Sequence, residues 1–255
     1  VRSDAETDMG NAWPDPLTTA QEAQARQYIA HDDHGTPKAP WYLVVLPAST
    51  EHPAKRMEDM LTEGLAAHDL SPGAGHAPRV APEDHRRRIA DHELGHVVSM
   101  ALGLRTAERD GLYDQYVEEC RADAFEAMRR VQREGSGAAA CTDLVAKRDI
   151  FAATRADAVH WTSPVVRAAG AHAAKLEREG SLEGLRPAAM MRVCDRVAGE
   201  HALQRESFFA FWDALDAHAA GQPLEDQSDP AGRDAARDAL AGYARARLRD
   251  AAPSW

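Results

Sequence analysis

The chain has few cysteines, few aromatic residues and no long hydrophobic run. Its 255 residues include only 3 cysteines, Cys120, Cys141 and Cys194, and 6% of the residues are aromatic. An odd number of widely spaced cysteines is not the pattern of a disulfide framework, so we expect a reducing compartment.

No apolar stretch approaches the ~20 residues of a membrane-spanning helix. The polar start, Val1 to Asp4, lacks a secretory signal pattern. We therefore expect a cytoplasmic protein without a membrane partner; a secreted or translocated effector stays open.

Positive charge is also in deficit. The chain has 30 lysine and arginine residues against 41 aspartate and glutamate residues, which gives a net charge of −11 at pH 7. A protein that binds nucleic acid needs a basic surface to neutralise phosphates. The charge balance therefore argues against a nucleic-acid partner, and it says nothing about the oligomeric state.

The hydrophobic pattern predicts an α+β fold that is predominantly helical, with a small sheet. Trp41 to Leu46 is a continuous apolar run between two prolines, which predicts a strand buried on both faces. Residues 1–16 predict a flexible arm, and helices are expected at 18–30 and 53–68. Beyond the Gly-rich loop at 134–138 the helical spacing predicts five further helices, at 142–158, 164–178, 187–199, 204–219 and 229–249. We expect a core at 17–135 and an all-helical region at 142–255, which either completes the functional cleft or forms a separate domain.

One five-residue motif carries a specific chemistry. It reads His92-Glu93-Leu94-Gly95-His96, in a segment that begins near Pro82 and ends at Gly103. Residues four apart share one face of a helix, so the two imidazoles can bind a single ion with Glu93 beside them. Apolar residues fall on the opposite side, so the helix is expected to pack its back into a core. The motif predicts half of a zinc site, in which Glu93 is a general base and not a ligand.

The next expected helix, 114–133, offers the missing ligand. Glu119 and Asp123 are four residues apart along one edge of its apolar stripe. We expect Glu119 to be the third zinc ligand and Asp123 to accept the ring N–H of a ligating histidine, which would fix its tautomer. Asp114, Glu118 and Asp123 itself stay open as alternative third ligands.

Together these two elements resemble the gluzincin clan of zinc metallopeptidases, and in particular its compact, minigluzincin-like members. In these the His-Glu-x-x-His helix is followed a few tens of residues later by a Glu-x-x-Ala-Asp pattern, which here reads Glu119-Cys120-Arg121-Ala122-Asp123. The resemblance covers roughly residues 82–128. It implies a zincin-like catalytic core, one Zn²⁺ ion, and hydrolysis of peptide bonds in a peptide or protein substrate.

Such enzymes usually supply one more donor to the oxyanion that forms on the substrate. The sequence offers five candidates without ranking them: Tyr113, Tyr116, His160, His172 and His201. A strand edge is also expected to bind the extended substrate, either at Trp41 to Leu46 or near Arg79 and Val80.

Two other functions stay open. The dipeptides His31-Asp32 and His68-Asp69 resemble part of the site of HD-type metal-dependent phosphohydrolases. The chain could also be a non-catalytic or regulatory partner-binding protein with a zincin fold. The presence of Glu93 argues against this last reading, because a scaffold has no use for the base.

Overall fold

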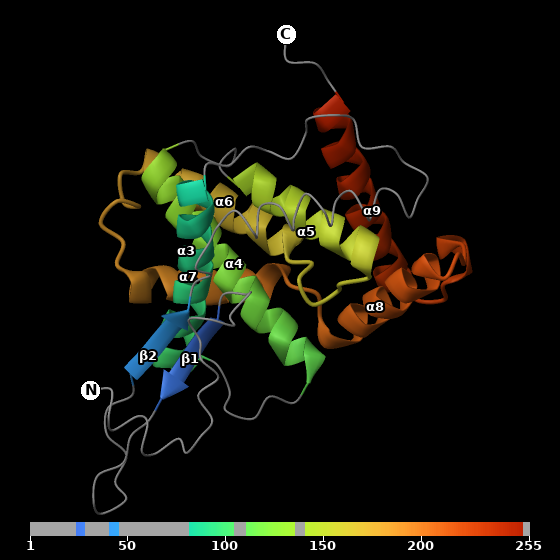
Figure 1. The fold of residues 1–255 in the computed structure, drawn as a ribbon, viewed down its shortest axis with the longest axis horizontal. Coiled ribbons are helices and arrows are strands. Elements are labelled where there is room, and N and C mark those ends of the chain that lie inside the picture. Colours follow the sequence, from blue (N-terminus) through green and yellow to red (C-terminus); the bar gives the residue numbers. More distant parts are fainter. Residues whose placement is uncertain (1–23, 29–40, 46–81, 105–110, 136–140, 252–255) are drawn as a thin grey trace, which may run out of the picture.

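The computed structural model describes residues 24–28, 41–45, 82–104, 111–135 and 141–251, which form a body of packed helices beside a pair of short strands (Figure 1). The α-helices of the described part are α3 (Pro82–Ala101), α4 (Leu112–Glu134), α5 (Thr142–Arg155), α6 (Ser163–Arg178), α7 (Pro187–His201), α8 (Arg205–Ala219) and α9 (Pro230–Ala251). A short 3-10 turn, η2 (Leu224–Asp226), lies between α8 and α9.

Helix α4 is the centre of this body. It contacts α3 on one side and α6 and α7 on others, and Figure 1 shows it running through the middle of the fold. Its apolar stripe is fully buried at Cys120, Ala124 and Met128. The same hydrophobic core continues through α5, α6, α7 and α8. Trp161, between α5 and α6, packs against Phe211 of α8 with tilted rings whose centroids are 4.6 Å apart. Residues before position 136 and after position 140 therefore share one core.

The predicted α+β class is wrong for the described part of the chain. Its strands are β1 (Gln24–Tyr28) and β2 (Trp41–Val45), which form one antiparallel pair beside α3. Two five-residue strands are too few to make a layer on which helices can pack. The core forms instead between the apolar faces of helices, so the described fold is helical and lacks the sheet expected of a zincin-like core.

The predicted helix positions agree with the structure in the second half of the chain and less well in the first half. The helix expected at 18–30 is wrong where the structure describes it, because Gln24–Tyr28 is strand β1. The helix of the motif begins at Pro82 and ends just before Gly103, as expected, with Gly103 at a left-handed φ of 66°. The five helices predicted after residue 141 are confirmed within a few residues at each end.

Several predictions lie outside the described residues. These are the arm at 1–16, the helix at 53–68, the strand near Arg79 and the dipeptides His31-Asp32 and His68-Asp69. Within the described part, no helix combines the length and the apolar character needed to cross a membrane.

Candidate metal centre

The candidate site lies where α3 and α4 come closest. Gly95 makes this approach possible, because a Cβ atom at this position would lie 2.9 Å from Ala122 Cα and 3.2 Å from the Ala122 carbonyl oxygen. Only glycine fits such a contact without moving a helix. The motif histidines, on either side of Gly95 in sequence, therefore face the turn of α4 that carries Glu119 and Asp123.

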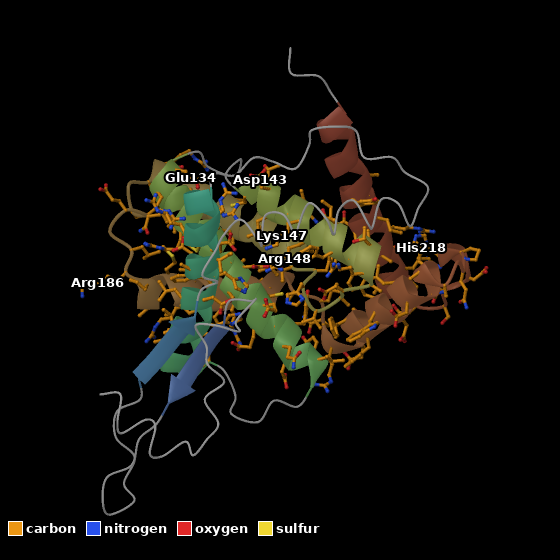
Figure 2. The ribbon with its side chains drawn as sticks, in the orientation of Figure 1. Glu134, Asp143, Lys147, Arg148, Arg186 and His218 are labelled. Atoms are coloured by element: carbon orange, nitrogen blue, oxygen red, sulfur yellow. The ribbon has the colours of Figure 1, made fainter. Side chains whose placement is uncertain are left out.

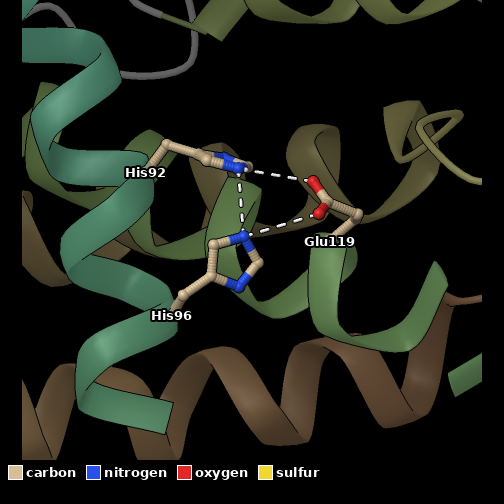
Figure 3. A group of neighbouring side chains, drawn as sticks. All are labelled: His92, His96 and Glu119. Atoms are coloured by element: carbon tan, nitrogen blue, oxygen red, sulfur yellow. Dashed lines mark hydrogen bonds and ion pairs between the residues drawn. The ribbon is translucent and has the colours of Figure 1, made fainter. Parts of the chain in front are cut away.

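Three side chains, two from α3 and one from α4, converge between the two helices (Figure 3). His92 Nε2 lies 3.2 Å from His96 Nε2 and 3.3 Å from Glu119 Oε2, and His96 Nε2 lies 3.4 Å from Glu119 Oε1. All three side chains are largely shielded, with 13% to 18% of their surface exposed. The structure thus brings together the two histidines and the glutamate that the sequence singled out.

The spacing of these atoms fits a zinc ion. Zinc binds imidazole nitrogen and carboxylate oxygen at about 2.0–2.1 Å in a tetrahedron, which separates neighbouring ligand atoms by about 3.3 Å. Glu119 Oε2 is buried and has no hydrogen-bond partner among the described residues, although His92 Nε2 is near. A buried carboxylate oxygen without a donor is costly unless a cation compensates it. The donor set of two imidazoles and one carboxylate is that of many catalytic zinc sites.

The electrostatics of the three groups also favour a cation. Burial opposes ionisation of Glu119, but the two facing imidazoles outweigh it and hold the pKa of Glu119 well below its ordinary value. Burial lowers the pKa of His92, yet contact with Asp123 and Glu119 raises it overall to about 10. The negative charge of Asp123 and Glu119 that raises the pKa of His92 also favours a metal cation between the histidines and Glu119.

Asp123 occupies the position expected of it, behind His92. His92 Nδ1 lies 2.8 Å from Asp123 Oδ1, and the Asp123 side chain is completely buried. Burial opposes ionisation of Asp123 as well, but the guanidinium of Arg148 and the His92 ring lower its pKa far below the usual range. Arg148 and Thr162 complete its surroundings through hydrogen bonds to both carboxylate oxygens.

Glu93, the expected base, is also buried, with 7% of its surface exposed. Burial raises the pKa of its carboxyl above the ordinary value, and the nearby His92 and His96 only partly offset this. A carboxylate with a raised pKa is a stronger base than one in water.

The alternative third ligands take other places. Glu118 accepts hydrogen bonds from Ser99 Oγ and Arg121 Nη1 on another side of α4. Asp114 lies in the first turn of α4. Asp123 contacts the other ring nitrogen of His92, Nδ1, and not the Nε2 that faces His96. The cluster that could hold an ion between both histidines therefore contains Glu119.

The structure also ranks the five candidate donors. Tyr113 donates to the Leu203 carbonyl oxygen, and the Tyr116 hydroxyl accepts the Leu203 N–H, so both phenols serve the contact with the end of α7. His160 instead lies at the site, with Nε2 3.7 Å from Glu119 Oε2. Its side chain is 40% exposed, and Nδ1 lies 2.8 Å from Asp157 Oδ2. His172 and His201 lie on α6 and α7, and His201 is exposed.

Sequence reasoning missed the residues that α5 and the segment after it contribute. Arg148 and Thr162 are 25 and 39 residues from Asp123, and no local pattern connects them to it. Asp157 and His160 are three apart, a spacing that could have indicated a carboxylate orienting an imidazole.

Taken together, the site offers three inward-facing ligand atoms, a buried carboxylate next to them in sequence and a partly exposed histidine at its edge. Three protein ligands leave one tetrahedral position for water or substrate, which distinguishes catalytic from structural zinc sites. No protein-family model matches the chain, and neither a curated protein nor a solved structure matches it.

Proposed function

We propose that this chain is a zinc-dependent peptidase whose ion is held by His92, His96 and Glu119. The observation that supports the proposal most directly is the set of mutual distances of 3.2–3.4 Å between three ligand atoms from two helices. When bound there, zinc would act as a Lewis acid that polarises a carbonyl and lowers the pKa of a water molecule.

Glu93 is the proposed general base. It would accept a proton from the water that attacks the scissile carbonyl and later give that proton to the leaving nitrogen. Its burial supports this role, because burial raises the pKa of the carboxyl and so makes the carboxylate a stronger base than one in water.

His160 is the proposed donor to the substrate oxygen on which negative charge develops. Asp157 holds the ring through Nδ1, which leaves Nε2 directed toward Glu119 and the centre. The 40% exposure of this side chain supports access of a substrate to it. In its protonated form His160 would stabilise the oxyanion through one charge-assisted hydrogen bond.

The test combines metal analysis with an activity assay on a degenerate peptide library. We expect the purified wild-type protein to bind one equivalent of zinc and to cleave library peptides in a reaction that chelators abolish. Glu93→Gln should retain zinc and lose about 10²- to 10⁴-fold in kcat, since it removes a general base and no ligand. Glu134→Gln, at the exposed end of α4 (Figure 2), is the matched control and should behave as wild type.

Two results would contradict the proposal. A wild-type protein that does not bind zinc would remove its basis. A Glu93→Gln protein that binds zinc and cleaves as fast as wild type would remove the assigned base. One equivalent of zinc without peptide hydrolysis would favour the alternative of a regulatory, partner-binding protein that keeps its metal.

A further inference from the structure

We infer that Arg148, on α5, is a positioning residue of this centre: it fixes Asp123 so that His92 presents Nε2, and only Nε2, to the ion. The inference rests on the proposed zinc site and adds to it a part that lies outside the motif helix and α4. It makes the helical region after residue 141 a component of metal binding.

The contacts around Asp123 carry the argument. Arg148 Nε donates to Asp123 Oδ2 and Arg148 Nη2 donates to Asp123 Oδ1, both at 2.6 Å. Thr162 Oγ1 donates to Oδ2, and His92 Nδ1 lies 2.8 Å from Oδ1. Asp123 and Thr162 are completely buried, and Arg148 is 5% exposed. Arg148 lies in the middle of the helical body, whereas Arg186 lies at its edge (Figure 2).

The hydrogen bonds that Asp123 accepts determine which ring nitrogen of His92 carries the proton. A carboxylate accepts about four hydrogen bonds, two at each oxygen. Arg148 provides two and Thr162 one, and a guanidinium is a donor that gives up no proton in proteins. Three donors thus already use Asp123 as an acceptor, so in the remaining contact, at 2.8 Å, His92 Nδ1 donates its N–H to Asp123 Oδ1. The lone pair available to a metal is then that of Nε2, the atom that faces His96 and Glu119.

The bidentate contact between Arg148 and Asp123 also fixes the orientation of the Asp123 carboxylate. Two parallel N–H···O bonds define the plane of the Asp123 carboxylate, and that plane in turn sets the orientation of the His92 ring. The same guanidinium lies 4.0 Å from Glu119 Oε2. One arginine from α5 thus sits next to both carboxylates that α4 contributes to the centre.

The experiment measures zinc affinity by competition with a chelator in the full chain. Arg148→Met removes both donors with little loss of volume and should weaken zinc binding by about 10- to 100-fold, the usual effect of losing a partner of a metal ligand. Arg148→Lys keeps the charge and loses the bidentate geometry, so it should fall between Arg148→Met and wild type. Thr162→Val removes a single donor and should weaken binding by about 2- to 10-fold.

A spectroscopic measurement separates positioning from a general loss of stability. In the cobalt-substituted protein, the exchangeable Nδ1 proton of a ligating histidine gives its own paramagnetically shifted resonance. We expect Arg148→Met and Thr162→Val to shift or broaden the resonance of His92 and to leave that of His96 in place. A purely structural role of Arg148 would not single out one histidine.

Arg121→Met is the matched control. Arg121 lies two residues from both Glu119 and Asp123 on α4 and makes hydrogen bonds to Glu118 and Asp195, away from the centre. This variant should lose stability and keep the zinc affinity and the His92 resonance of wild type. If Arg148→Met lacks native circular dichroism, Arg148→Lys and Thr162→Val decide by the same two measurements.

Wild-type zinc affinity and an unaltered His92 resonance in the folded Arg148 and Thr162 variants would overturn the inference and leave the zinc site intact. An equal loss of zinc affinity in Arg121→Met would overturn it too, because the effect would then be general. A wild-type protein that binds no zinc would instead refute the proposed function itself.

Discussion

Glu118 and Glu119 are neighbours on α4 and meet opposite environments. Glu118 is 8% exposed and is surrounded by donors, with Ser99 Oγ on one oxygen and Arg121 Nη1 on the other. Glu119 faces the imidazole nitrogens of His92 and His96, and its buried Oε2 accepts no hydrogen bond from the described residues. Two identical side chains, one residue apart, therefore differ in what compensates their charge.

The difference shows how to tell a structural carboxylate from a metal ligand. Burying a carboxylate costs free energy unless hydrogen bonds or a cation replace the lost water. Arg121 and Ser99 supply that replacement for Glu118, because each of its two oxygens accepts a hydrogen bond, and the bond from Ser99 joins α3 to α4. Glu119 faces two imidazoles within 3.4 Å, and the nearest guanidinium nitrogen, of Arg148, is 4.0 Å away. A cation shared by the two histidines and Glu119 would satisfy all three at once.

Neutralising each glutamate in turn should have the largest effect and tests whether the two environments give the residues different roles. Glu119→Gln should weaken zinc binding by about 100-fold or more, because it replaces a charged ligand with a neutral amide. Glu118→Gln should keep zinc binding and lower the free energy of unfolding by about 1–3 kcal/mol, because Arg121 loses its buried partner. Chelator competition and urea denaturation measure the two quantities.

Thermal unfolding provides an independent check of the same pair. At a free zinc concentration of about 100 times the Kd, binding should stabilise wild type by about 2.7 kcal/mol. For a chain of this size that corresponds to a Tm increase of about 5–10 °C. Glu118→Gln should retain the increase and Glu119→Gln should lose it. Equal behaviour of the two variants would mean that the environments do not distinguish their roles.

From residue 82 onward, the positions of the described helices could be predicted from the sequence, because apolar spacing and turn residues mark where they begin and end. Pro82 and Gly103 bound α3, and the apolar stripe of α4 follows its 3.6-residue period. The convergence of His92, His96 and Glu119 could be predicted for the same reason, since it depends on faces of two consecutive helices. The roles of these residues stay a prediction.

What the sequence did not predict depends on contacts between distant segments. The sheet was expected because Trp41 to Leu46 has strand composition, but composition does not say how many strands pair or whether helices cover them. The contact of Arg148 with Asp123 could not be predicted either, since the two residues are 25 positions apart and lie on different helices. The number and boundaries of domains stay a prediction.

Gly95 sets the distance between α3 and α4, and the contacts of both glutamates with α3 depend on that distance. Gly95→Ala would place a Cβ atom 2.9 Å from Ala122 Cα and 3.3 Å from Phe125 Cβ, so one helix must move. We expect a loss of about 1–3 kcal/mol in the free energy of unfolding. Zinc affinity should also fall, because the movement separates the histidines from Glu119.

Gly199→Ala is the control for Gly95→Ala. Gly199 lies within α7, and a Cβ atom there would meet nothing within 4 Å. Alanine should therefore stabilise the protein by about 0.5–1 kcal/mol, the usual gain over glycine inside a helix, and leave zinc binding unchanged. Opposite signs for two Gly→Ala changes would tie the effect at Gly95 to the contact between helices. Equal signs would show that the close approach is not required.

The smallest expected effect tests whether the Glu118 network is independent of the metal centre. Ser99 is completely buried, and its Oγ donates to Glu118 Oε2 at 3.2 Å. Ser99→Ala should reduce the free energy of unfolding by about 0.5–1.5 kcal/mol, since Glu118 keeps the stronger contact with Arg121. The control is Ser181→Ala at an exposed position. It loses a hydrogen bond to the Leu176 carbonyl oxygen and should change the free energy of unfolding by less than about 0.5 kcal/mol.

Because Glu118 and Glu119 are compensated by separate groups, zinc affinity should stay at the wild-type value in both serine variants. A weaker affinity in Ser99→Ala alone would show that the donors around Glu118 help to place Glu119, and the two environments would then be one coupled network.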